Sequence, residues 1–174
     1  MADDVSSRLW NADVDAAVYG AAGEKYQQAI LEQYKIYVEM ADRVSARRAL
    51  ANTFFLTLNT SILTVFGVLF SATAASSASW WLIVPLLALL GECAAWFYLV
   101  RSYRQLNTAK YRVVGALEER LPASPYWKAE WVALGEGGDR SKYWPLTHLE
   151  QWVPIGFGLI YLAGFLIAVI AQSG

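Results

Sequence analysis

One apolar stretch of the sequence carries hydroxyl groups at regular intervals. The spacings alternate between four and three, so on a helix the residues share one face. We call them the hydroxyl stripe: Thr53, Thr57, Thr60, Thr64, Gly67 and Ser71. Asn59 and Ser61 flank this face. In a membrane, such groups pack against a neighbouring helix, line a water-filled path, or bond carbonyls of their own helix. The pattern leaves these three interpretations open.

Glu92 is the single charged residue between positions 49 and 100. It precedes Arg101 by nine residues, about 13 Å at helical rise. A charge at the centre of a membrane span costs about 2.5–3.5 kcal/mol on insertion scales, so Glu92 should not face lipid. We expect Asn59 or the hydroxyl stripe to be its partner. Glu92 is then either a neutral, hydrogen-bonded acid that fixes helix packing or a group that takes part in ion passage or gating.

Basic residues gather at the ends of the apolar runs. They are Arg43, Arg47 and Arg48 before the first run, and Arg101 and Arg104 after the second. Lys and Arg near the ends of spans favour the cytoplasmic side, so we expect the N-terminus inside and the C-terminus outside. The same arginines either contact anionic lipid headgroups, at about 1 kcal/mol each, or line a cytoplasmic mouth.

Three apolar runs are each long enough to cross a bilayer, which takes about 20 residues. Charged residues make up only 17% of the chain, against about 25% in soluble domains. The sequence therefore predicts an all-α integral membrane protein. We expect an acidic N-terminal segment at 1–23, a cytoplasmic amphipathic helix at 24–52, transmembrane helices at 53–75, 80–100 and 152–171, a cytoplasmic helix at 101–121, and a cytoplasmic Trp/Pro/Gly loop region at 122–150.

The cytoplasmic helices should continue the spans without a break. No Gly or Pro interrupts residues 24–66, and the second span should extend into 101–121, where Gly115 is the one exception before Pro122. Two stripes mark faces for helix packing: Ile30, Tyr34, Tyr37, Ala41 and Val44 in the first helix, and Tyr103, Leu106, Lys110, Val113 or Val114, and Leu117 in the second. A short helix is predicted around residues 126–133. Thr147 and Glu150 have the spacing of a capping box before the third span.

The composition argues against several classes of protein. A net charge of −1 gives no basic field for nucleic acid, so we expect no direct nucleic-acid binding. The chain has one cysteine, Cys93, and one histidine, His148, which is too few for a zinc site. The glycines at 135–138 lack a phosphate-binding pattern. We expect no catalytic residues, no metal and no cofactor, and the acidic N-terminus predicts no signal peptide.

A resemblance adds to this interpretation. Residues 31–63 read "LEQYKIYVEMADRVSARRALANTFFLTLNTSIL". This segment resembles the RipA-like family of small octameric bacterial inner-membrane proteins. The layout of the chain also resembles the octameric membrane pore that accompanies type VI CRISPR systems and, more loosely, the SLATT effectors of phage defence. The resemblance implies a ring-shaped homo-oligomer of eight subunits with a role in defence or stress.

Two functions therefore compete. The first is a homo-oligomeric inner-membrane channel or pore that perturbs the membrane in antiviral defence or stress. Its pore-lining or subunit-contact residues would be the threonines of the stripe with Asn59, Ser71 and Glu92, and its inner mouth would lie at residues 43–48. The alternative is a non-conducting scaffold in the lipid bilayer that recruits a cytoplasmic protein partner.

Overall fold

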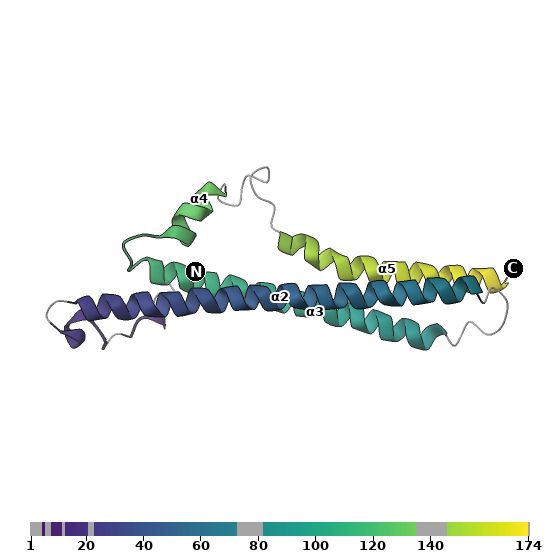
Figure 1. Cartoon of the computed structure of the whole chain (residues 1–174), viewed down its shortest axis with the longest axis horizontal. Helices are drawn as coiled ribbons and strands as arrows, with labels where there is room; N and C mark the ends of the chain where they lie inside the picture. The colour runs from purple at the N-terminus through teal and green to yellow at the C-terminus, as the bar shows by residue number, and fades with distance from the viewer. Residues whose placement is uncertain are drawn as a thin grey trace. The chain divides into compact units, whose positions relative to one another are not determined.

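The computed structural model describes residues 5, 8–11, 13–20, 23–72, 82–134 and 146–173, without the side chains of 69–72, 146–148 and 171–173 (Figure 1). The elements are, in chain order, the 3-10 helix η1 (Ala16–Tyr19), the helices α2 (Glu24–Ala72) and α3 (Ile83–Glu118), the π-helical η3 (Pro125–Glu130), α4 (Trp131–Ala133) and α5 (Leu146–Ser173). Three helices are long and apolar enough to cross a membrane, over Glu24–Val68, Ile83–Glu118 and Leu149–Ile170. The predicted fold class, an all-α membrane protein with three candidate spans, is confirmed.

Two of these helices are much longer than a bilayer requires. Helix α2 has 49 residues and α3 has 36, which at helical rise correspond to about 74 and 54 Å. The hydrocarbon core of a bilayer is only about 30 Å thick. The structure confirms that each of the first two apolar runs belongs to one longer, unbroken helix. The absence of Gly and Pro from residues 24–66 explains the unbroken α2.

The chain divides into two compact units. One, which we call the charged unit, comprises Met1–Ala46 and Arg104–Trp144; the other, the apolar unit, comprises Arg47–Tyr103 and Pro145–Gly174. The boundary crosses α2 between Ala46 and Arg47 and α3 between Tyr103 and Arg104, among the basic residues that flank the apolar runs. The apolar unit thus contains the parts of α2, α3 and α5 that are suited to hydrocarbon.

In the charged unit, the first part of α2 packs against the last part of α3. Ile30 and Ala41 of the predicted seam are buried, as are Val114 and Leu117 of the facing stripe. The Lys110 ammonium lies 4.7 Å from the centre of the Tyr37 ring, in cation–π geometry. Leu106 of the same stripe is 46% exposed, so it lies at the edge of this contact.

Glu118, at the end of α3, holds the following segment in place. Its side chain is 1% exposed. Four donors reach its carboxylate: the Tyr34 hydroxyl at 3.0 Å, the Ser124 hydroxyl at 2.7 Å, the Tyr126 amide at 3.1 Å and the Trp127 amide at 2.9 Å. Burial alone raises the pKa of the Glu118 carboxyl, but these hydrogen bonds together hold it below its ordinary value. A charged side chain thus organises the start of the predicted short helix, which is confirmed as η3 and α4.

Gly115 lets the Trp127 ring approach α3 closely. A Cβ atom added at Gly115 would lie 2.6–2.9 Å from three atoms of that ring. The absence of a side chain at this position therefore permits the contact. Together with the hydrogen bonds to Glu118, it fixes the loop segment on α3.

Helix α5 begins earlier than the sequence indicated. It starts at Leu146, so Thr147 lies inside the helix and the predicted capping box before the third span was wrong. Pro154 is buried and lies inside the helix, well past its first turn. The glycines at 135–138 lie outside the described residues.

Candidate functional site

The apolar unit has an aromatic centre built from its three helices. Trp96 of α3 is 1% exposed. Its ring stacks on Phe55 of α2, with 5.6 Å between centroids and 11° between planes, and lies 6.0 Å from Phe157 of α5. The indole Nε1 donates to Asn52 Oδ1 at 2.8 Å, so its polar atom is satisfied. This packing holds the three helices in a fixed register around the neighbouring polar residues.

A polar cluster lies beside this centre and joins all three helices. Asn59 of α2 is fully buried. Its Nδ2 donates to Glu92 Oε1 of α3 and to the Phe55 carbonyl, both at 2.9 Å. The Tyr161 hydroxyl of α5 donates to Asn59 Oδ1 at 2.7 Å. The Cys93 thiol lies 3.8 Å from the same oxygen. Both polar atoms of the Asn59 side chain, Nδ2 and Oδ1, thus form hydrogen bonds, as a buried amide in an apolar region requires.

Glu92 is half-buried at the edge of this cluster. Of the two partners that the sequence suggested, Asn59 or the hydroxyl stripe, the structure shows Asn59 within the protomer. Ala88 and Ala95, about one turn away on either side, are exposed. One side of Glu92 therefore faces the protomer interior, and the other borders a surface of small residues.

The hydroxyl stripe faces away from the protomer core. Its four threonines are all exposed. Thr53, Thr60 and Thr64 donate to the carbonyl four residues earlier, at 3.0, 2.7 and 2.9 Å, as Ser61 does at 2.8 Å. Bonding within the helix, one of the three interpretations, is thus observed. It satisfies the donors but leaves the oxygen lone pairs free for another group. Ser71 belongs to α2, and its side chain lies outside the described residues.

The arginines that flank the first two apolar runs lie in different environments. Arg48 Nε lies 3.4 Å from Glu150 Oε2 of α5, and both side chains are largely buried. Arg48 thus joins two helices within the apolar unit. Arg43 pairs with Glu39 on the exposed surface, at the predicted i, i+4 spacing. Arg47 and Arg101 are exposed, and Arg104 is half-buried.

Sequence reasoning missed Tyr161 and the ion-pair role of Glu150. Tyrosine in a membrane span is usual near the interface, whereas Tyr161 lies midway along the third apolar run. That position was an available signal for a polar contact. Glu150 gave no such signal, because its spacing from Thr147 suggested a cap.

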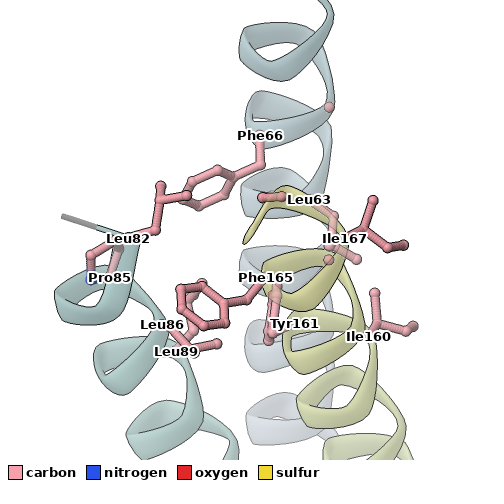
Figure 2. A pocket seen from close by; sticks show the side chains of 13 residues that line it. Leu63, Phe66, Leu82, Pro85, Leu86, Leu89, Ile160, Tyr161, Phe165 and Ile167 are labelled. Carbon is pink, nitrogen blue, oxygen red and sulfur yellow. The ribbon is translucent and has the colours of Figure 1, made fainter. Parts of the chain in front are cut away.

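Beyond the polar cluster, toward the C-terminal end of α2, the three helices line a half-open apolar cavity of about 440 Å³. Figure 2 shows Phe165 of α5 turned toward Leu86 and Leu89 of α3 across it. The cavity is lined by Leu63, Phe66, Gly67, Leu82, Pro85, Leu86, Leu89, Ile160, Tyr161, Gly164, Phe165, Ile167 and Ala168. Tyr161 and Gly67 connect the cavity to the polar cluster and to the hydroxyl stripe, respectively.

A comparison with protein families decides the affiliation of the chain. The profile of the octameric membrane protein family (8xMP) matches residues 31–170. The chain belongs to the octameric membrane protein family. The match extends well past the 31–63 segment that carried the resemblance, and it covers the helices that form the cluster. No curated protein and no solved structure matches the chain.

The cluster is a set of hydrogen-bonding groups that joins the three helices. It combines an amide, a carboxyl, a phenol and a thiol, which can hold helices together and border a polar surface. Within the described part of the chain, no group of three His, Cys, Asp or Glu side chains is placed to hold a metal ion. The contacts that the structure shows at the site are hydrogen bonds between α2, α3 and α5.

Proposed function

We propose that the chain forms a homo-octameric ring in the bacterial inner membrane and that this ring conducts ions or small solutes when triggered. The observation that carries the proposal is the position of Glu92 and the hydroxyl stripe. Both present polar atoms on the outside of the protomer, midway along apolar helices. Polar groups at that depth are expensive against lipid. A ring of eight subunits would cover them with protein or expose them to water.

The hydropathy of the helices supports an assignment of faces within this ring. The most apolar window of α5 has a mean hydropathy of 2.4, against 1.9 for α3 and 1.4 for α2. The most apolar helix is the one best suited to lipid, and the least apolar is best suited to an axis. We therefore place α5 at the periphery and α2 nearest the axis. Arg43 and Arg47, which are exposed on α2, would then border the cytoplasmic mouth.

The orientation is part of the proposal. Basic residues flank the first two spans on the same side, and none follows position 142, which supports a cytoplasmic N-terminus and an external C-terminus. Alkaline phosphatase, which is active only outside the cytoplasm, should be active when fused after Gly174. Green fluorescent protein at the same position should stay dark when exported through the general secretory route. The reverse pattern would reject this topology.

Cysteine labelling tests the pore directly. In a Cys93→Ala background, which removes the one native thiol, Ser61→Cys on α2 should become a target for a charged thiol reagent. We expect the reagent to block ion flux from liposomes that contain this variant. Leu159→Cys, on the exposed face of α5, serves as the matched control and should leave flux unchanged on treatment. A wild-type octamer without flux under any trigger would eliminate the channel.

The alternative, a scaffold for a cytoplasmic partner, has its own supporting observation. The segment after Glu118 exposes four large apolar side chains: Tyr126, Trp127, Trp131 and Val132. Exposed aromatic residues grouped on a short segment are typical of a protein contact. The scaffold predicts an octamer without flux. In either case we propose no catalytic step, and a role in antiviral defence or stress response belongs to the proposal.

A further inference from the structure

Only one of the two Glu92 carboxyl oxygens forms a hydrogen bond inside the described part of the protomer. Oε1 accepts from Asn59 Nδ2 at 2.9 Å. Oε2 has no hydrogen-bond partner among the residues that the structure describes. The side chain is half-buried and borders the exposed Ala88 and Ala95. An open carboxyl oxygen at membrane depth, beside residues small enough for a close helix contact, indicates a further protein partner.

The depth of that partner follows from the contact with Asn59. Because Glu92 touches Asn59, it lies level with this part of α2. Thr60 is one residue and Thr57 two residues from Asn59, or about 1.5 and 3 Å along the helix axis. In a ring whose axis runs along the membrane normal, every residue keeps its depth in every subunit. Glu92 of one subunit can therefore meet the middle of the hydroxyl stripe of the next subunit.

The direction of the stripe favours a contact between subunits over one within a subunit. Successive residues turn by about 100° around a helix, so Thr60 points away from Asn59 and from the Glu92 that Asn59 contacts. The stripe and Glu92 thus occupy two different flanks of the protomer. A closed ring requires such a pair of unlike, complementary flanks.

The hydrogen-bonding chemistry of the two flanks is complementary. The Thr60 hydroxyl donates its hydrogen to the Leu56 carbonyl at 2.7 Å, which leaves its lone pairs free to accept. A protonated carboxyl accepts at one oxygen and donates from the other. We propose that Glu92 of each subunit accepts from its own Asn59 at Oε1 and donates from Oε2–H to the Thr60 hydroxyl of the neighbouring subunit. The occupant of the Glu92 flank is a second copy of this chain, a step that rests on the octameric ring proposed above.

This contact would link neighbouring subunits to the whole helix bundle. Within each subunit, Glu92 is joined through Asn59 to Tyr161, so one network touches α2, α3 and α5. The neighbour's α2 would become a fourth member of that network. Removing the Glu92 carboxyl should therefore weaken assembly while leaving the aromatic centre around Trp96 intact.

Disulfide cross-linking between two differently tagged full-length chains tests the pairing. Both chains carry Cys93→Ala; one carries Glu92→Cys and the other Thr60→Cys. Co-expressed and oxidised in membranes, they should give a dimer that contains both tags. Thr53→Cys in place of Thr60→Cys is the matched control, because it lies on the same stripe about 10 Å farther along the helix. The pair of Glu92→Cys with Thr53→Cys should form much less of this dimer than the pair with Thr60→Cys.

A second probe leaves Glu92 unaltered, in case the cysteine variants assemble poorly. A photoreactive benzoylphenylalanine at position 60 should attach to the α3 peptide that contains Glu92 of another subunit. Native mass spectrometry of the same preparation reports the subunit number. An octamer in which position 60 links to lipid or to α5 would overturn the pairing but keep the ring. A monomer would overturn the pairing and the proposed function together.

Discussion

Replacing Glu118 by alanine should release the segment 124–133 from α3. The substitution removes the acceptor for four hydrogen bonds and leaves the Tyr126 and Trp127 amides without their partner. Loss of a buried, charged hydrogen-bonding group costs about 3 kcal/mol. Because 1.4 kcal/mol is a factor of ten, we expect local opening to rise about a hundredfold. Tryptic cleavage after Lys128, within this segment, would measure that opening.

Two variants control this experiment. Glu119→Ala changes the adjacent, exposed carboxylate and should leave cleavage near the wild-type rate. Glu118→Gln keeps one acceptor oxygen but places an NH2 donor against other donors, so its effect should be intermediate. Equal cleavage in Glu118→Ala and Glu119→Ala would show that the carboxylate does not anchor the segment.

The same site predicts a pH dependence. Folding lowers the pKa of Glu118, so the carboxylate stabilises the folded segment fully above its unfolded pKa, near the ordinary value of 4.5. That contribution is lost as the pH falls through the lower, folded pKa. Hydrogen exchange at the Tyr126 and Trp127 amides should therefore keep its protection at neutral pH and lose it in acid below that range. Protection that is lost at neutral pH instead would contradict this assignment.

The second large effect is expected from Asn59→Leu, a change of similar size that removes the centre of the polar cluster. It leaves Glu92 Oε1 without its donor and takes the side-chain acceptor from Tyr161. Hydrogen bonds between membrane helices contribute about 0.6–2 kcal/mol each, and an unsatisfied polar group in hydrocarbon costs more. We expect a loss of about 2–4 kcal/mol in resistance to unfolding by SDS in mixed micelles.

Ser61→Ala is the matched control, because Ser61 is exposed and its hydroxyl bonds only the Thr57 carbonyl of its own helix. It should change stability by less than about 0.5 kcal/mol. A double-mutant cycle sharpens the test: Tyr161→Phe should destabilise the wild type but have little effect in the Asn59→Leu background. Additive effects would show that the two side chains do not share one network.

The sequence itself determined the class of the protein and the course of its helices. Uncharged runs of about 20 residues have few stable environments other than a bilayer, and an uninterrupted stretch such as 24–66 has no reason to break. The same reasoning limited the partner of Glu92 to Asn59 or the hydroxyl stripe, because a carboxyl inside a membrane must find a polar partner near its own depth.

Other features became visible only in the tertiary structure. Three of the four donors that meet Glu118 lie six to nine residues after it, but the fourth, the Tyr34 hydroxyl, comes from a helix 84 residues away. No local pattern brings Tyr34 and Trp127 to the same carboxylate. The partnership of Arg48 with Glu150 likewise depends on how α2 and α5 pack, and the early start of α5 replaced the cap expected at Thr147. Helical periodicity tells which residues share a face. What each face meets depends on contacts between segments far apart in sequence, and in the described residues those contacts turned Asn59 inward and left the hydroxyl stripe outside.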